Sequence, residues 1–352
     1  MLRSMSSAIT GLTLNQTALD VIGNNIANMG TTGYKAQTLT FSDSLSQSMR
    51  DPSSPSPTYG GSNGIQIGLG AGIAGVNTLL TQGNFQPTSR NLDNAIDGDG
   101  YFIVGEGPTL FDPTNDGIKV DATNHVFSND TKWNQKQENI SYTRDGSFNL
   151  DQDGNLVTAS GLRVLGYSME DTNVTPSTES ISSSGTINFV NANAINSGTK
   201  ASTVKAVSGT LRTLRIPQEI KNASGKFIKV KNFSIDKSGV IKAVLDDGNT
   251  SVVGQIAMAS FANPAGLVKL GNNVVQESQD SGKPIIRSGY NDTTADNSKG
   301  FGSIQNGVLE MSNVDIAEQF TKMIEATRSF QANGKMITTG DEILQDLVNL
   351  KR

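Results

Sequence analysis

The sequence predicts a mostly β protein of the α+β class, in which two antiparallel β-domains are nested and the N- and C-terminal helices pair as a coiled-coil-like core. Apolar residues recur at 3–4 spacing at both ends of the chain, as on one face of a helix. Between the ends, short alternating segments are separated by turn residues, as in strands. One helix of about 25 residues does not bury such a stripe alone. We therefore expect the ends to contact each other, other copies of the chain, or both.

The first helix is expected from about Ser4 to Asn28 and ends before Gly30 and Gly33, because glycine tolerates the left-handed conformation that follows helices. A second helix is expected within 306–352, where the same spacing of apolar residues returns. If the strands between them run out and back, both termini come to the same side of the molecule.

The large apolar residues of the two stripes are predicted to mediate self-assembly. They are Leu2, Met5, Ile9, Leu12, Leu19, Ile26, Ile316, Phe320, Met323, Ile324, Phe330, Ile337, Ile343, Leu347 and Leu350. Gly23 and Gly334 lie on the same stripes, where a missing side chain would let the backbones of two helices approach closely. The alternative is that these stripes form an ordinary core within one chain.

The predicted domains follow changes in composition and in the expected secondary structure along the chain. They are an N-terminal core helix (1–30), an extended linker arm (31–64), an inner β-domain (65–170 and 254–305), an inserted outer β-domain (171–253) and a C-terminal core helix (306–352). The arm is rich in Pro and Gly around 51–64. Hairpins are expected over 147–158, turned at Asp153-Gly154, and over 233–243, turned at 237–239.

Composition argues against an enzyme. The chain of 352 residues has a net charge of −5, no Cys and one His, so thiol chemistry, multi-histidine metal sites and nucleic-acid binding are disfavoured. His125 lies among turn residues and is interpreted as a solvated loop side chain. No run approaches the roughly 18 apolar residues of a membrane span, and no cleavable export signal is recognisable. The body is rich in Ser, Thr, Asn and Gly, which favours an extracellular protein exported by a specialised route.

Two short motifs are better explained by the fold than by ligands. Gly70 to Gly75 matches a dinucleotide-binding pattern, with Asp93 near the position of a ribose ligand, but no helix of sufficient length follows. The segment from Asn149 resembles the first half of a calcium-binding loop, but Ser160 stands where a bidentate Glu is required. We expect neither a cofactor nor a metal ion.

Three separated groups of residues resemble the flagellar rod and hook proteins of bacteria. The first is Asn24, Asn25, Ile26, Ala27 and Asn28 with Thr31, Thr32, Gly33, Tyr34 and Lys35; the second spans 82–102 and 142–148; the third spans 306–315, including Ser312, Asn313, Val314 and Asp315, with 330–333 and 347–350. The resemblance covers about half the chain and leaves 171–253 without a comparable motif.

The resemblance implies a structural subunit of the flagellar hook, which polymerises helically into a hollow flexible tube that couples the rod to the filament and transmits torque. It implies, as partners, further copies of the chain, the distal rod, hook cap and hook–filament junction proteins, and the flagellar export apparatus. A distal rod protein is the alternative, although such proteins are usually shorter and lack a second large β-domain. From other classes, an extracellular glycan-binding adhesin and an NAD-linked enzyme remain as hypotheses.

Overall fold

The computed structural model describes residues 2–55, 57, 60–106, 118–121, 125–127, 140–171, 178–181, 186–192, 204–207, 209–222, 225–291 and 301–350. The chain divides into two compact units. Unit 1 comprises Met1–Gly30, Lys35–Thr81 and Asn313–Arg352, and unit 2 comprises Thr31–Tyr34 and Gln82–Ser312. As predicted, the protein is mostly β with a helix near each end.

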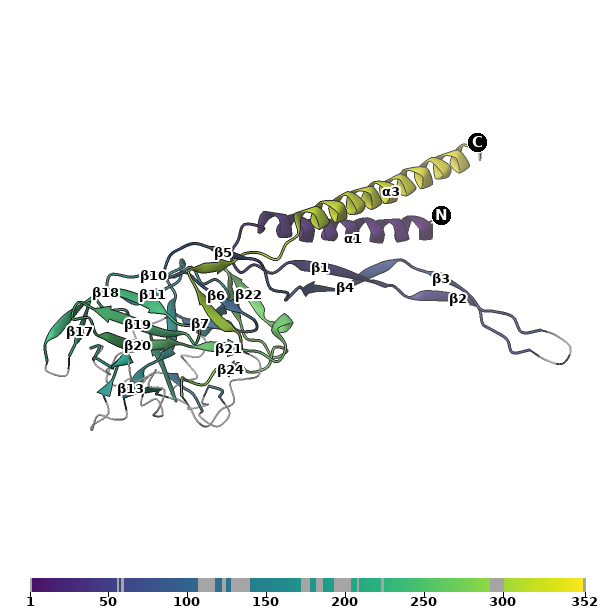
Figure 1. The fold of residues 1–352 in the computed structure, drawn as a ribbon. Helices are drawn as coiled ribbons and strands as arrows, with labels where there is room; N and C mark the ends of the chain where they lie inside the picture. Colours follow the sequence, from purple (N-terminus) through teal and green to yellow (C-terminus); the bar gives the residue numbers. More distant parts are fainter. Residues whose placement is uncertain are drawn as a thin grey trace. The chain divides into compact units, whose positions relative to one another are not determined.

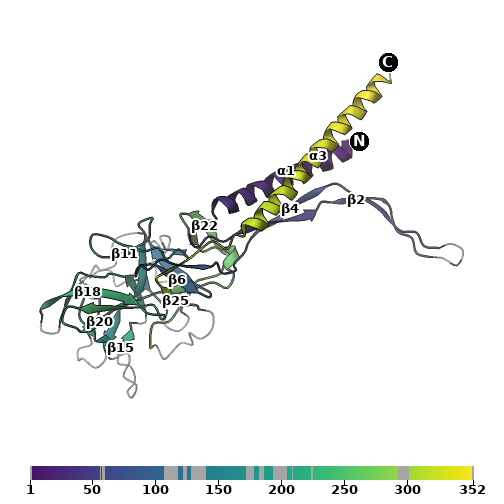
Figure 2. The ribbon, with the colours of Figure 1, turned by 45° about the horizontal axis from the view of Figure 1, so that its top comes forward.

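Unit 1 contains the two long helices, α1 (Leu2–Ala27) and α3 (Ile316–Asn349), which lie side by side in Figures 1 and 2. The start of α3 is capped by Asp315, whose carboxylate accepts hydrogen bonds from the backbone N–H groups of Ala317 (2.9 Å) and Glu318 (3.3 Å). Of the two glycines expected to end this helix, Gly33 takes a positive φ of 67°, whereas Gly30, the one nearer to α1, does not take a positive φ.

The rest of unit 1 is a two-stranded ribbon, which we define as residues 37–78. In it, β1 (Gln37–Asp43) pairs with β4 (Ala71–Thr78), and β2 (Ser46–Arg50) pairs with β3 (Ile65–Gly68). Ser53 and Ser62 form a further bridge. The predicted linker arm is thus extended, but it is hydrogen-bonded to the strands that follow it.

Unit 2 is built on a 15-stranded sheet with the central order β17-β18-β19-β20-β12-β7-β9-β23-β22. Its joined neighbours run antiparallel. The elements of unit 2 are β5 (Phe85–Pro87), β6 (Asn94–Asp97), β7 (Tyr101–Gly105), β8 (Ile118–Lys119), β9 (Ile140–Thr143), β10 (Asn149–Leu150), β11 (Leu156–Val157), β12 (Arg163–Tyr167), β13 (Met169–Asp171), β14 (Thr178–Glu179), β15 (Val204–Ala206), β16 (Thr210–Thr213), β17 (Glu219–Lys221), β18 (Phe227–Ile235), β19 (Val240–Leu245), β20 (Thr250–Ile256), β21 (Met258–Ser260), the 3₁₀ helix η2 (Pro264–Gly266), β22 (Val268–Gly271), β23 (Val274–Gln276), β24 (Ile285–Ile286), β25 (Ser303–Asn306) and β26 (Val308–Glu310).

Both predicted hairpins are confirmed. Strand β10 pairs with β11 around a turn in which Gly154 has a φ of 81°, and β18 pairs with β19 around a turn in which Gly239 has a φ of 83°. These positive angles explain why glycine ends each turn.

The compact units are divided at boundaries other than those expected from sequence. Residues 65–81 group with the helices and not with a β-domain that begins at 65. Strands β17–β20, which fall in or border the expected outer domain (171–253), share one sheet with β12 and β7. The pairing of Gly166 with Ile256 joins strands about ninety residues apart, and such long-range registers leave no local signal in the sequence.

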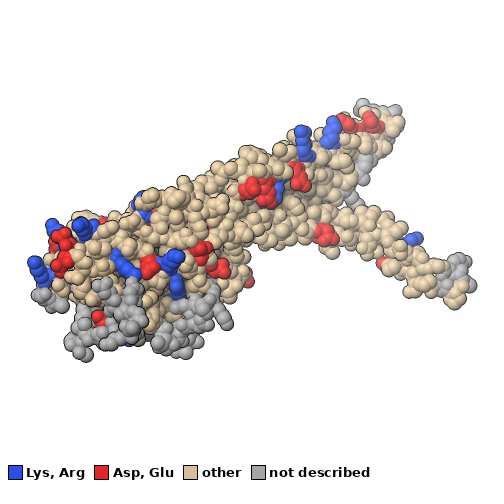
Figure 3. Space-filling model, in the orientation of Figure 1, with Lys and Arg blue, Asp and Glu red and all other residues tan. Residues whose placement is uncertain are grey.

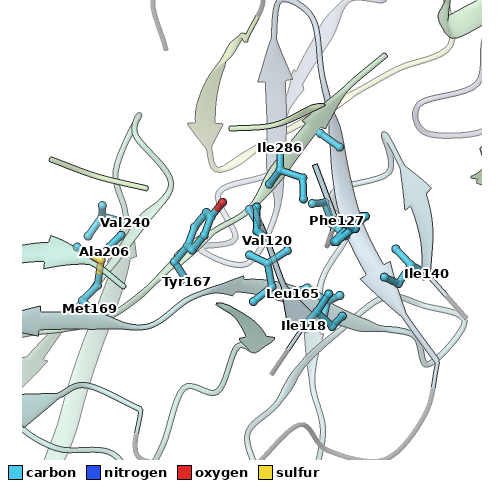
Figure 4. Close-up of a cluster of buried hydrophobic side chains, with 14 of the residues drawn as sticks. Ile118, Val120, Phe127, Ile140, Leu165, Tyr167, Met169, Ala206, Val240 and Ile286 are labelled. Atoms are coloured by element: carbon cyan, nitrogen blue, oxygen red, sulfur yellow. The ribbon is translucent and has the colours of Figure 1, made fainter. Parts of the chain in front are cut away.

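Unit 2 has a large hydrophobic core of its own. In one cluster, Leu165, Val120 and Ile118 pack close together, and the Tyr167 hydroxyl donates a 2.9 Å hydrogen bond to the Arg287 carbonyl (Figure 4). In a second cluster, the rings of Phe102 and Phe148 meet edge to face at 5.1 Å.

Candidate self-assembly surface

The two helices of unit 1 run antiparallel. A Cβ added at Gly340 would lie 3.2 Å from Met5 Cγ, and the Asn25 side chain lies 3.1 Å from Gln319 at the other end of the pair. The first residues of α1 therefore lie beside the last turns of α3, which brings the two ends of the chain together as the sequence predicted.

We call the contact between α1 and α3 the seam. The buried residues of the two helices are Ala8, Leu14, Ile22, Asn25, Gln319 and Ala326. A Cβ at Gly11 would lie only 2.8 Å from the Asn333 amide nitrogen, whereas one at Gly23 or Gly334 would meet nothing within 4 Å. The expectation of close approach at Gly23 and Gly334 is therefore wrong for the single chain, because the glycines that face the opposite helix are Gly11 and Gly340.

None of the described residues predicted for self-assembly is fully buried in the single chain. Met5, Leu12, Leu19, Ile26, Met323, Phe330 and Ile337 are half-buried, and Ile9, Ile316, Phe320, Ile324, Ile343, Leu347 and Leu350 are exposed. The side chain of Leu2 lies outside the described residues. The structure thus leaves a large part of both apolar stripes accessible to another molecule.

The ribbon adds a second exposed apolar surface. Ile65, Ile67 and Leu69 alternate along one strand and are all more than 40% exposed. Phe41 and Ile73 lie opposite each other across β1 and β4 and are each about half exposed. Figure 3 shows few charged residues on the visible face of this ribbon. A two-stranded ribbon is marginally stable in water unless its apolar face is covered.

A groove of about 340 Å³ opens between α1, α3 and β1 within unit 1. Ala18 and Ile22 contribute from α1, and Leu39 and Phe41 from β1. On the α3 side, Lys322 and Glu325 give the groove a charged edge. Its size and apolar lining suit one or two large side chains.

The polar residues of the N-terminal family motif act through the backbone. Asn25 bonds both polar groups of the Gln37 backbone, donating to its carbonyl at 2.7 Å and accepting from its N–H at 2.9 Å. Asn28 donates to the Asn24 side chain at 2.7 Å. Ile26 is half-buried and Ala27 is exposed.

On the unit 1 side, Asn313 connects three segments. Its amide donates to the carbonyls of Leu79 (2.9 Å) and Thr81 (3.0 Å), and its oxygen accepts from the Ala36 N–H at 2.8 Å. The Lys35 ammonium also donates to the Thr81 carbonyl, at 2.9 Å. Asn313 and Lys35 thus hold together the strand that enters the ribbon, the strand that leaves it and the start of the segment that leads to α3.

The remaining motif residues lie within unit 2 or flank α3. The Gly33 N–H donates to the Glu310 carbonyl at 2.8 Å, and the Thr32 carbonyl accepts from the Asn273 amide at 3.1 Å. The Tyr34 ring faces the Lys269 ammonium at 5.1 Å. Ser312 and Val314 are half-buried, and they flank Asn313 before the capping residue of α3.

Sequence reasoning missed a buried ion pair in unit 2. The Arg144 guanidinium lies 3.3 Å from the Glu310 carboxylate, and both side chains are buried. The Nε of Arg144 also donates to the Gly100 carbonyl at 3.0 Å. Arg144 and Glu310 both occur in segments that resemble the family. They are far apart in the chain, so no local pattern in the sequence indicates that they form a pair.

The two ligand-like motifs are structural. Gly70 to Gly75 lies at the start of β4 in the ribbon, paired with β1. The Asp151 carboxylate accepts hydrogen bonds from the N–H groups of Asp153 (2.9 Å) and Asn155 (2.7 Å), as in a tight turn. Desolvation raises the pKa of Asp151, but these hydrogen bonds and that of the Asn155 amide outweigh it, so the pKa lies below its usual value.

The described residues contain no group of three or more His, Cys, Asp or Glu placed to hold a metal ion. None of the described helices combines the length and apolar character that crossing a membrane requires. His125 is half-buried, and its backbone N–H donates to the backbone carbonyl of Asp121 at 2.8 Å.

Family models match both ends and the middle of the chain. The flagella basal body rod protein model matches residues 5–35, the flagellar hook protein FlgE/F/G D1 domain matches 132–243, and the flagellar basal body rod FlgEFG protein C-terminal model matches 305–350. The chain is also 36% identical to the flagellar basal-body rod protein FlgG of Bacillus subtilis, over the full length of both proteins. The chain belongs to the flagellar hook and basal-body rod protein family.

The family includes relatives of both kinds. The flagellar hook protein FlgE of Borreliella burgdorferi is 33% identical, again with all of both chains covered. Among solved structures, that of Helicobacter pylori flagellar hook protein FlgE2 aligns with a TM-score of 0.37 and 12% identity, over 64% of this chain and 100% of that chain, which is too low to support a conclusion. As a member of this family, the chain is a structural component of the bacterial flagellum.

Proposed function

We propose that this flagellar axial protein is the hook subunit, which polymerises helically into a hollow, flexible tube that couples the rod to the filament. Its partners would be further copies of itself, the distal rod, hook cap and hook–filament junction proteins, and the export apparatus. Its place would be extracellular. The domains expected from sequence would then correspond to a helical inner core and outer β-shells.

The observation that supports assembly is the unequal exposure of apolar residues in the two units. Unit 1 has exposed large apolar side chains along α1, α3 and the ribbon, whereas its buried apolar residues are only Ala8, Leu14, Ile22, Ala36 and Ala326 among those described. Unit 2 buries two extensive clusters. Its described exposed apolar side chains are Leu150, Phe227, Val244, Val268, Leu270 and Ile285.

Burial of a large apolar side chain contributes about 1.5 to 3 kcal/mol. Unit 1 hides few such side chains within the single chain, so the helices and ribbon gain most of their stability by packing against other copies. Ends that are weakly stable before assembly also suit passage through a narrow export channel. We expect the monomer to show frayed helices that become ordered in the polymer.

The choice between hook and rod rests on the size of the β-region. Strands β16 to β20 all belong to the broad sheet of unit 2, and the chain aligns with hook proteins along its whole length. One observation favours the rod: the alignment with the rod protein of Bacillus subtilis has 352 positions, whereas that with the Borreliella hook protein has 448. The distal rod is therefore the second candidate.

In a bending tube, the outer subunit surfaces must slide while the core holds. The sequence of unit 2 is rich in Ser, Thr, Asn and Gly, which make weak, exchangeable and water-bridged contacts where they are exposed. We propose that unit 1 supplies the fixed contacts and unit 2 the sliding ones.

Immunoelectron microscopy distinguishes the two candidates. An antibody raised against the β18–β19 hairpin should label the curved external segment of purified hook–basal bodies if the protein is the hook. Labelling restricted to the straight segment within the cell envelope would assign it to the rod. A strain that lacks the gene provides the control for antibody specificity.

A further inference from the structure

Glycines lie at two places where α1 and α3 face each other: a Cβ added at Gly11 or Gly340 would lie within 3.2 Å of a side chain of the opposite helix. Small residues allow close approach, but they do not interlock as large side chains do when they insert between four neighbours. The large buried residues of the pair, Leu14 and Ile22, both belong to α1. Packing at the glycines therefore adds little preference for the observed register over one displaced by a helical turn, about 5.4 Å.

One polar pair interrupts this seam. The Asn25 amide donates a 3.1 Å hydrogen bond to the Gln319 side-chain oxygen, and the two residues are only 1% and 3% exposed. After a slip of one turn, the Gln319 oxygen would be buried without its Asn25 donor, and leaving a buried polar group unsatisfied costs about 1–3 kcal/mol. A buried polar pair in an apolar helix contact is a known means of fixing register.

Asn25 is itself fixed by the ribbon. Its amide bridges the N–H and carbonyl of Gln37, the first residue of β1, so its side chain cannot follow a sliding α3. Gln319 lies in the first turn of α3, whose start is capped by Asp315. The pair therefore links α1, the base of the ribbon and the beginning of α3.

We propose that Asn25 and Gln319 determine the register of α1 against α3, and thereby the positions at which the exposed apolar residues are offered to neighbouring copies. Ile9 on α1 and Leu347 on α3 both lie on surfaces exposed in the single chain. A slip of one turn would shift the exposed apolar residues of α1 against those of α3 by about 5.4 Å. This role rests on the proposed assembly, for which the pair acts as a positioning device and not as part of the contact between copies.

Cysteine pairs in the full-length chain measure the register directly, because the natural sequence contains no Cys. Met5→Cys with Gly340→Cys reports the observed register, since the added Cβ at 340 lies 3.2 Å from Met5 Cγ. Met5→Cys with Met336→Cys, or with Leu344→Cys, reports a slip of one turn in either direction. After free thiols are alkylated, a disulfide within one chain is read as a band that migrates faster than the reduced monomer on a non-reducing gel, for the soluble chain and for the polymer.

The test variant is Gln319→Met, which keeps the shape of the side chain and removes the acceptor while leaving the bonds of Asn25 to Gln37 in place. We expect the ratio of in-register to slipped disulfide to fall by about threefold to tenfold, the effect of one net hydrogen bond. The matched control, Thr321→Met, introduces the same side chain at an exposed position of α3 and should preserve the ratio. Electron micrographs of Gln319→Met polymers should also show a wider spread of helical parameters.

An unchanged ratio in Gln319→Met would overturn the proposal, whether or not the variant assembles. If Gln319→Met lowers helix content, the ratio in a second variant, Gln319→Leu, decides, because it also keeps the bonds of Asn25 to Gln37. A fall in the ratio supports the role, and an unchanged ratio contradicts it. Failure of the unmutated chain to form any polymer would contradict the proposed function, while the disulfide ratio in the soluble chain would still test the register.

Discussion

The Arg144 guanidinium lies 3.3 Å from the buried carboxylate of Glu310, and it also donates to the carbonyls of Gly98 and Gly100. Replacement by Met would leave the Glu310 charge buried without its partner, which typically destabilises a protein by about 3–5 kcal/mol. Arg144→Met should therefore lower the denaturant midpoint of unit 2 strongly, as followed by circular dichroism. Arg144→Lys should restore only part of the loss, because one ammonium cannot reproduce the planar set of donors.

The control for this variant is Lys205→Met, which removes a partly exposed ion pair with Glu170. Exposed pairs contribute about 1 kcal/mol or less. Equal destabilisation by Arg144→Met and Lys205→Met would contradict the assignment of the Arg144–Glu310 pair as a structural centre of unit 2.

Phe320 and Ile324 are 50% and 62% exposed on α3, so their substitution should affect assembly and spare the single-chain fold. In the double variant Phe320→Asp and Ile324→Asp, we expect hook formation and motility to be lost. The β-sheet spectrum of the purified chain should be unchanged. Thr321→Asp, also exposed on this helix, is the matched control. Normal motility in the double variant would count against the predicted stripe.

Gly11 and Gly23 of α1 should respond in opposite ways to a side chain. At Gly11 a Cβ already lies 2.8 Å from the Asn333 side chain, so Gly11→Val should weaken the α1–α3 pair. At Gly23 nothing lies within 4 Å, and Gly23→Ala should raise helix stability by about 0.5–1 kcal/mol through propensity. Thermal unfolding of the soluble chain, followed at 222 nm, checks both; a similar sign for the two variants would refute the assignment of the seam.

The β18–β19 hairpin should make stability depend on pH. The hydrogen bond from Lys242 to the Asp236 carboxylate, at 2.8 Å, holds the pKa of Asp236 below its usual value. Because the folded-state pKa is the lower one, the stabilisation is fully present above the unfolded pKa of about 4 and is lost as pH falls through the folded pKa.

Asp236→Asn should remove this contribution, so the stability difference from the natural chain should be seen at neutral pH and vanish in strong acid. Urea unfolding at several pH values between 2 and 7 measures it. Lys242→Met serves as the partner control, and a difference that persists unchanged at the lowest pH would argue against the ion pair as the cause.

Local signals in the sequence predicted the helices and the hairpins well. The spacing of Met5 and Ile9 marked α1, and Asp153-Gly154 marked the β10–β11 turn, because each depends on residues within one or two turns of chain. The sequence predicted that the first part of the ribbon is extended. It did not predict that Phe41 pairs with Ile73, because this pairing joins strands on either side of the Pro-rich segment.

The sequence did not predict which residues form the seam, and the reason is different. A search for large apolar residues selects side chains such as Phe320, which is exposed, and passes over Ala8 and Gly11, which face the opposite helix. Polar residues of the family motif were recognisable by resemblance, yet their partners are backbone groups, such as those of Gln37 for Asn25, and no pattern in the sequence predicts these.

The assembly of the chain through unit 1 is tested most directly by electron microscopy of the purified full-length protein beside a fragment of residues 82–312. The full chain should form hollow tubes under conditions that promote polymerisation. The fragment, which keeps the core of unit 2 but lacks the helices and the ribbon, should remain a folded, β-rich monomer. Tubes formed by the fragment, or a full-length chain that stays monomeric under every such condition, would contradict the account.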